Sequence, residues 1–161
     1  MEDLMAEKEH SGTFEHEAPE PGPEHARLEV FIGKWINEGV TVGTPEEAKI
    51  LTSDVYEWIP GRFAVLHTAY GRIGEMGVGG VEVLGYDAER GNYTSHFFDS
   101  QGHVTVDDLI YDDGKWIWAG ERIRTTSEFS DDGRIQRSLH EQTEDGVEWR
   151  LAMDVTLKKV E

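Results

Sequence analysis

Short runs of alternating apolar and polar residues fill the chain from residue 35 onward, with turn-forming residues between them. Pro-Gly, Asp-Gly and Asp-x-x-Gly sequences mark the breaks, since they supply the positive φ that tight connections require. Runs such as 50–59, 92–98 and 147–160 are rich in Val, Ile, Thr and aromatic residues. No interval is long enough for a crossover helix, so we predict about ten antiparallel strands joined by hairpins.

One break is longer and rich in glycine, residues 71–80. Its glycines lack the spacing of a dinucleotide-binding loop, and no helical pattern follows them. We interpret this stretch as a flexible connection and predict no cofactor.

A meander of about ten strands must protect its two edge strands from pairing with other chains. An open sheet of that width is difficult to keep from aggregating, whereas closure into a barrel removes the edges. The predicted fold is therefore all-β, an antiparallel up-and-down barrel. Because eight strands already leave room for one small ligand, about ten should enclose a cavity unless large side chains fill it.

The first 23 residues have a different composition, with many glutamates and with prolines at alternate positions near their end. Such a segment cannot bury enough apolar surface to fold, so we predict a disordered acidic tail over 1–23 and one domain over 24–161. A short helix should lead into the first strand and end near Gly33. Its apolar positions at helical spacing are Leu28, Phe31 and Ile32.

The chain has 161 residues, a formal net charge of -18 and no cysteine. The missing cysteines exclude disulfides, zinc-thiolate sites and thiol nucleophiles. An acidic surface is repelled by nucleic acid and by anionic lipid, so neither is an expected partner. No apolar run reaches a membrane span, and the N-terminus lacks the pattern of a secretion signal, so we expect a cytoplasmic protein. The sequence is compatible with a homo-oligomer and does not determine the oligomeric state.

Several blocks, in order, carry a family resemblance: FIGKW, YEWIPGRFAVLHTAYGRIG, GYDAERGNYTSHFFDSQG, FSDDGR and DGVEWRLAMDVTLKKV. On these residues the chain resembles, from Glu24 to Glu161, a bacterial family of small lipocalin-like (calycin-type) proteins. The resemblance implies a barrel of about ten strands, the architecture of fatty-acid-binding proteins and nitrobindins, and no established catalysis. The Gly33-x-Trp35 pattern is similar to the start of such barrels, which implies that Trp35 closes one end.

Strand alternation then sorts side chains into an inner and an outer face. In the last strand the apolar face is clear, and we expect it inside: Trp149, Leu151, Met153, Val155 and Leu157. In 134–142 the apolar residues Ile135 and Leu139 predict that Arg137 and Glu141 face inward and that His140 faces outward. A buried Arg137 would pair with a carboxylate or bind an acidic ligand.

The run 115–124 allows two orientations. Trp116, Trp118, Arg122 and Arg124 share one face, and the isoleucines share the other. We favour tryptophans inside, with Arg122 as a cationic anchor for an amphipathic acid. In the other orientation the tryptophans would cover an outer surface, such as an oligomer interface.

Three histidines lie within predicted strands. His67 shares its face with Phe63, Val65 and Ala69, so we place it inside, as a core residue or as a polar contact of the cavity. His96 and His140 complete no metal-ligand spacing with it, and we predict no metal site.

The leading prediction is a protein that binds a small hydrophobic or amphipathic molecule inside the barrel. An alternative is a small barrel enzyme, an isomerase, cyclase or hydrolase, with His67 as base and Arg122 or Arg137 as oxyanion stabiliser. A filled barrel that binds a protein partner is a third possibility. The predicted ligand-binding residues are Trp58, His67, Tyr70, Phe98, Trp118, Arg122 and Arg137.

Overall fold

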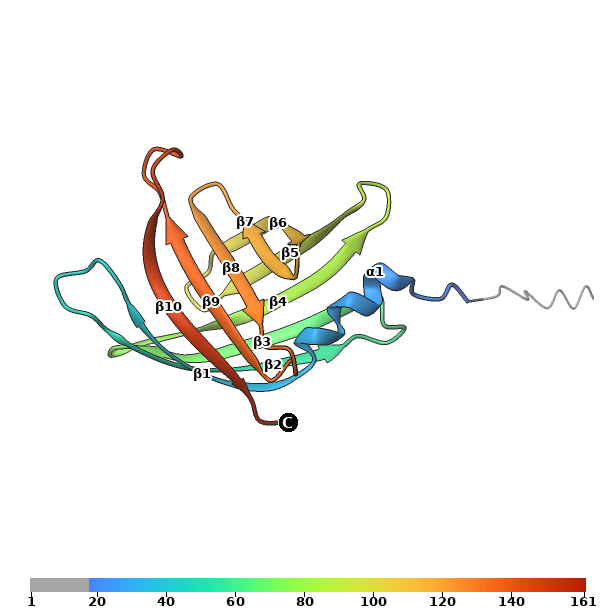
Figure 1. The fold of residues 1–161 in the computed structure, drawn as a ribbon, viewed down its shortest axis with the longest axis horizontal. Coiled ribbons are helices and arrows are strands. Elements are labelled where there is room, and N and C mark those ends of the chain that lie inside the picture. Colours follow the sequence, from blue (N-terminus) through green and yellow to red (C-terminus); the bar gives the residue numbers. More distant parts are fainter. Residues whose placement is uncertain (1–17) are drawn as a thin grey trace, which may run out of the picture.

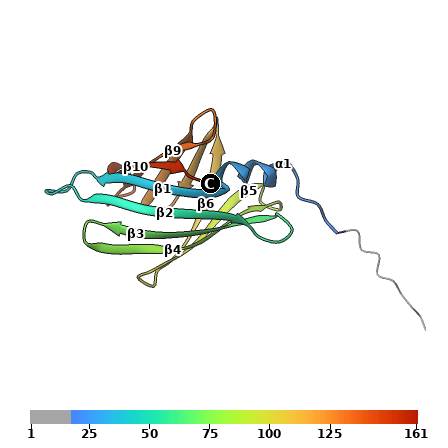
Figure 2. The same ribbon diagram turned by 90° about the horizontal axis from the view of Figure 1, so that it is seen from below.

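The computed structural model describes residues 18–161, and the chain there forms a closed antiparallel barrel (Figures 1 and 2). Each strand pairs with its neighbours in sequence, and β1 pairs with β10 to close the ring. The strands are β1 (Gly33–Thr41), β2 (Lys49–Trp58), β3 (Ala64–Ile73), β4 (Met76–Asp87), β5 (Asn92–Asp99), β6 (Val104–Asp112), β7 (Lys115–Ala119), β8 (Ile123–Phe129), β9 (Ile135–Gln142) and β10 (Arg150–Lys159). The predicted all-β barrel of about ten strands is confirmed. The predicted disordered tail falls mostly on residues 1–17, outside the described residues.

Tight turns join the strands where the sequence predicted them. Between β6 and β7, Asp113 and Gly114 have φ of 46° and 81°. Positive φ at both central residues is what a type I′ hairpin turn requires, and Asp-Gly is a favoured pair for it.

The glycine-rich stretch is not a flexible connection. Strands β3 and β4 run through it and meet at a short turn near Gly74. A Cβ at Gly79 would lie 2.5 Å from the Ala69 carbonyl oxygen, and one at Gly80 would lie 2.4 Å from that of Phe98. These glycines therefore allow close approach of neighbouring strands, a role that sequence alone does not distinguish from looseness.

A short helical segment leads into β1, as predicted, and it closes one end of the barrel (Figure 1). It comprises α1 (Pro23–Ala26) and the 3₁₀ helix η1 (Arg27–Phe31). Leu28, Phe31 and Trp35 are fully buried, and the Trp35 indole N–H donates to the Phe31 carbonyl over 2.8 Å. The Phe31 ring meets those of Tyr56, Trp116, Trp118 and Phe129. Burial of each such side chain stabilises the fold by roughly 1.5–3 kcal/mol, so this end is solidly packed.

In β10 the predicted inward face is correct for only part of the strand. Met153, Val155 and Leu157 line the interior. A β-bulge between Leu151 and Met153 reverses the faces, so Leu151 pairs with the outward Glu141. Trp149 lies against the outward Arg124, whose guanidinium carbon is 4.4 Å from the ring centroid. A bulge adds one residue and turns the preceding side chains to the other face.

The orientation predicted for β9 is wrong. Gln136, Ser138 and His140 line the interior, while Arg137 is exposed and forms an outer ion pair of 2.8 Å with Asp154. Glu141 likewise pairs with Arg124. The interior accepts polar side chains because they bind one another, as in the 2.6 Å hydrogen bond between the Ser127 and Ser138 hydroxyls.

The favoured orientation of β7 is confirmed, since Trp116 is buried and Trp118 lines the interior. Arg122 does not follow them, because β7 ends at Ala119 and Arg122 lies in the next loop. There its guanidinium donates to the Glu144 carbonyl.

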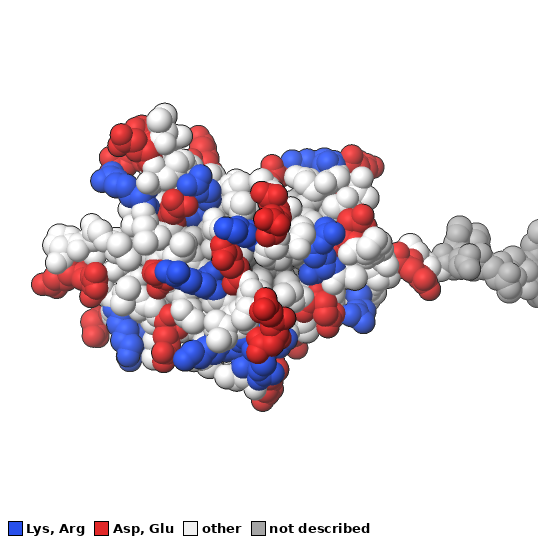
Figure 3. All heavy atoms as spheres, in the orientation of Figure 1, with Lys and Arg blue, Asp and Glu red and all other residues white. Residues whose placement is uncertain are grey.

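The outer surface seen in Figure 3 mixes acidic and basic side chains. Ion pairs join neighbouring strands there, as between Lys115 and Glu128 at 2.7 Å. Exposed pairs of this kind contribute little to stability. Within residues 18–161 no helix has the length and apolar character to cross a membrane.

Candidate functional site in the barrel interior

The barrel encloses a cavity of about 440 Å³ above the packed end. Ile123, Thr105 and Asp99 border it, and Ile123 and Thr105 are exposed, so the cavity opens at the end away from η1. Aromatic side chains of Tyr56, Phe97 and Trp118 form part of its wall. A hollow of this size fits a small ligand.

Buried polar side chains surround the cavity at mid-height, and we name them the polar belt. Each comes from a different strand and belongs to the inward set of alternate residues. The polar belt consists of Asn37, Asp54, His67, Glu82, Ser95, Ser127 and Ser138.

His67 lies between two carboxylates of the belt. Its Nε2 is 3.3 Å from Asp54 Oδ1, and its Nδ1 is 3.9 Å from Glu82 Oε1. The antiparallel pairing sets His67 directly opposite Tyr56 on β2 and Glu82 on β4. The Tyr56 ring stacks on the imidazole, with centroids 3.9 Å apart. The ring is thus fixed in position and orientation.

The charge of His67 follows from these neighbours. Burial acts to lower its pKa, but the interactions with Asp54 and Glu82 outweigh it and raise the pKa to about 9. At neutral pH the side chain is an imidazolium. Neither ring nitrogen has an aligned hydrogen bond, so the contacts are ion pairs by distance only.

His140, on β9, also lines the cavity but is uncharged at neutral pH. Burial lowers its pKa to about 4, and the charge of Asp54, which acts to raise the pKa, does not offset the burial. Its Nδ1 is 2.9 Å from the Thr125 hydroxyl, a hydrogen bond suited to a neutral ring. The cavity therefore holds one charged and one neutral histidine.

Four carboxylates line the cavity: Asp54, Glu82, Asp99 and Asp107. The Trp118 indole N–H donates a long hydrogen bond of 3.4 Å to Glu82 Oε1. Burial, and then the charges of Glu82 and Asp108, raise the pKa of Asp107. At the rim, backbone N–H groups of His103 and Gln101 lower the pKa of Asp99. No Lys or Arg is among the described residues of the lining.

Of the seven predicted ligand-binding residues, His67 and Trp118 line this cavity. Trp58 is half-buried near the closed end, where its indole N–H donates to Glu29 over 2.7 Å. Tyr70 and Phe98 point outward and are 67% and 55% exposed. Arg122 and Arg137 are also exposed on the outside, so no guanidinium anchors an acid in the interior.

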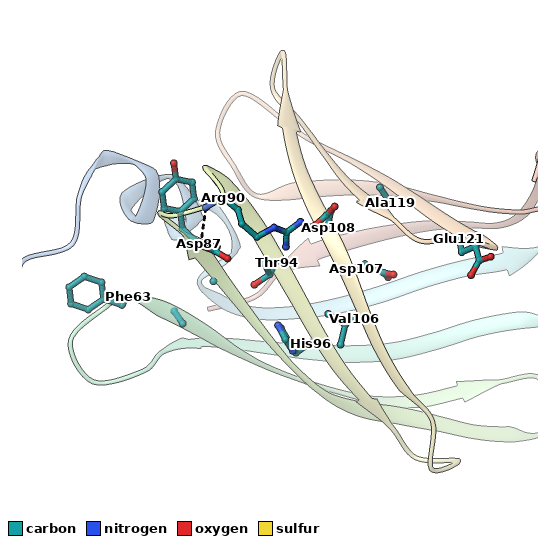
Figure 4. Close-up of a pocket in the computed structure, with 13 residues that line it drawn as sticks. Phe63, Asp87, Arg90, Thr94, His96, Val106, Asp107, Asp108, Ala119 and Glu121 are labelled. Carbon is teal, nitrogen blue, oxygen red and sulfur yellow. Dashed lines mark hydrogen bonds and ion pairs between the residues drawn. The ribbon is translucent and has the colours of Figure 1, made fainter.

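A second hollow lies on the outer face of β4 to β7 (Figure 4). Its volume is larger, about 700 Å³, and His96, Thr94 and Val106 line it. Arg90 pairs there with Asp108 at 2.9 Å, and both side chains are exposed to water. We take the interior as the candidate site because its polar groups are buried and incompletely paired. Asp107 borders both hollows.

No cluster of three or more His, Asp or Glu side chains within 18–161 is arranged to hold a metal ion. Asp54, His67 and Glu82 instead form a salt-bridged row along adjacent strands.

A family model described as "Protein of unknown function (DUF1579)" matches residues 20–134. The chain belongs to this family. A comparison with curated proteins finds no match.

Solved structures share the barrel. That of Rv2717c from M. tuberculosis has a TM-score of 0.62 at 12% identity, covering 87% of this chain and 99% of the other. The S-type phycobiliprotein lyase CPES from Guillardia theta has a TM-score of 0.61 at 9% identity, covering 86% and 93%. At such identities the likeness concerns the fold alone.

Proposed function

We propose that this member of the family binds a small amphipathic molecule inside the barrel, as lipocalin-like barrels do. The observation that carries the proposal is a cavity of about 440 Å³ whose wall holds polar atoms without partners. They are Asn37 Oδ1 and Gln136 Oε1. A buried polar atom left unpaired costs about 1–3 kcal/mol. A ligand or bound water that pairs with these atoms removes that cost.

The rest of the wall supports an amphipathic ligand. Rings of Phe97 and Trp118 and the side chains of Met153 and Val155 offer apolar contact. Transfer of ligand surface onto them contributes about 25 cal/mol per Å². Of the residues predicted from sequence, His67 and Trp118 remain in the proposed site.

Catalysis with His67 as a base is less well supported. With a pKa of about 9, His67 carries its proton at neutral pH and has no free lone pair for proton abstraction. Neither Arg122 nor Arg137 is near it to stabilise an oxyanion.

Filling the cavity tests the proposal. Ala69 lines the cavity, and Tyr70, next to it on β3, points outward. We expect Ala69→Phe to weaken binding of the neutral fluorescent probe N-phenyl-1-naphthylamine by about ten-fold or more, since the added ring occupies ligand volume. The matched variant Tyr70→Phe should bind as the parent does. Equal affinities in all three proteins, each shown folded by circular dichroism, would contradict the proposal.

A further inference from the structure

The charge of the cavity wall points to a particular class of ligand. Asp54, Glu82 and Asp107 contribute three carboxylates, and a fourth, Asp99, lies at the rim with its Oδ2 2.9 Å from His103 Nδ1. The one cationic side chain among the described lining residues, His67, lies between two of them. The wall is therefore net negative even with His67 charged.

The unpartnered amide atoms are hydrogen-bond acceptors, as the carboxylate oxygens are. The Asn37 side-chain nitrogen donates to Thr52 Oγ1 and Asp54 Oδ2, which leaves its oxygen without a donor. The Gln136 nitrogen donates to the Ser138 hydroxyl, and its oxygen is likewise unpaired. Asn37 and Gln136 are 3% and 2% exposed. Both need a hydrogen-bond donor, and the carboxylates beside them accept only.

Aromatic rings stand on the same wall as the acids. Trp118 contacts Glu82 through its indole N–H, and Phe97 lies opposite Glu82 in the β4–β5 pairing. The face of an aromatic ring attracts a cation, and most strongly when water is excluded. Carboxylates beside rings thus favour a positive group attached to an apolar body.

An anion meets the reverse conditions. It would lose its hydration and face the carboxylates of Asp54, Glu82 and Asp107, with no Lys or Arg in the lining to pair with it. The amphipathic acid considered from the sequence required Arg122 or Arg137 inside, and both lie outside.

We infer that the cavity selects an amphipathic organic cation, an amine whose ammonium group binds near Glu82 and Asp107 and whose apolar part lies against Trp118 and Val155. This inference rests on the proposed ligand-binding function and names its ligand class. The ammonium group supplies the donors that the carboxylates of Glu82 and Asp107 accept.

Three probes of equal chain length separate this inference from the function it rests on: octylamine, octan-1-ol and sodium octanoate. Their affinities are measured by displacement of N-phenyl-1-naphthylamine at neutral pH. We expect octylamine to bind about ten-fold tighter than octan-1-ol, which corresponds to about 1.4 kcal/mol, and octanoate to bind weakest. If octan-1-ol or octanoate binds as tightly as octylamine, the cation inference fails and the ligand-binding function stands. If no probe, including the neutral dye, enters the cavity, both fail.

A matched pair of charge variants separates the cavity from the acidic surface. Glu82→Gln removes a carboxylate from the cavity, and Glu57→Gln removes one from the outward face of β2. We expect Glu82→Gln to reduce octylamine affinity about ten-fold while octan-1-ol affinity stays within about two-fold. Glu57→Gln should change neither. Asp107→Asn provides a second cavity variant should Glu82→Gln fold poorly. Equal losses in cavity and surface variants would overturn the inference, because they would show general attraction to an acidic protein.

Discussion

Two walls of the same cavity shift the pKa of a histidine in opposite directions. On β2 to β4, His67 stands between Asp54 and Glu82, and its pKa is raised to about 9. On β8 and β9, His140 contacts the Thr125 hydroxyl, and its pKa falls to about 4. Burial lowers both values, so the difference comes from the carboxylates. The comparison shows that neighbouring charge, rather than depth, determines the chemistry of each wall.

Removal of each imidazole should give the largest difference in stability between the two walls. His67→Ala leaves the buried carboxylates of Asp54 and Glu82 without the cation between them, which costs about 3–5 kcal/mol of the free energy of unfolding. His140→Ala removes the same ring from the neutral wall and gives up one hydrogen bond, at about 1–2 kcal/mol. Urea unfolding at pH 7 measures both. Equal losses would mean that the acidic row does not need its cation.

The pH dependence of stability should differ in sign between the walls. The folded pKa of His67 lies above its unfolded value of about 6.5, so its stabilisation is complete below that pH and is lost as the pH rises toward 9. For His140 the folded pKa lies below the unfolded value, so stability falls as the pH drops from about 6.5 toward 4. Each contribution is on the order of a few kcal/mol.

Unfolding of the parent and of two matched variants across this range checks the signs. His67→Gln should flatten the alkaline side of the profile, and His140→Gln should flatten the acidic side. The same change in both variants would contradict the assignment of opposite charge states.

On the outside of the barrel, a charged residue should matter far less. Arg137 pairs with Asp154 across β9 and β10, and its side chain is 62% exposed. Arg137→Ala should lower the free energy of unfolding by less than about 1 kcal/mol, because water screens the pair. It should leave binding of N-phenyl-1-naphthylamine unchanged. A large loss of affinity would return Arg137 to the site that the sequence suggested.

The barrel was predictable because local chemistry determines it. Turn sequences such as Asp113-Gly114 locate the hairpins, and their short lengths require antiparallel neighbours. Inner and outer faces were less predictable. In β10 the bulge at Leu151 is set by pairing with β9, and in β9 the apolar Ile135 lies outside, 46% exposed, while Gln136 is buried.

The site was predictable only in part, through His67 and Trp118. Strand alternation could have identified two residues that were missed. Glu82 lies two positions before the core residue Leu84, and Asp54 lies two positions before Tyr56, so each pair shares the inward face. The same alternation, counted from His67, places Tyr70 outside.

The row formed by Asp54, His67 and Glu82 could not be predicted from the sequence. It depends on the register between three strands, which brings residues far apart in the chain to adjacent positions. Sequence spacing carries no information on that register without the neighbouring strands.

The most direct test of an acidic, ligand-binding interior is to determine where a bound amine lies in the protein. Nuclear Overhauser effects between octylamine and the protein report contacts of a few ångströms. We expect them from the ligand to the Trp118 ring and the Val155 methyl groups, which line the cavity. Contacts only with His96 and Val106, on the outer hollow, would contradict the account.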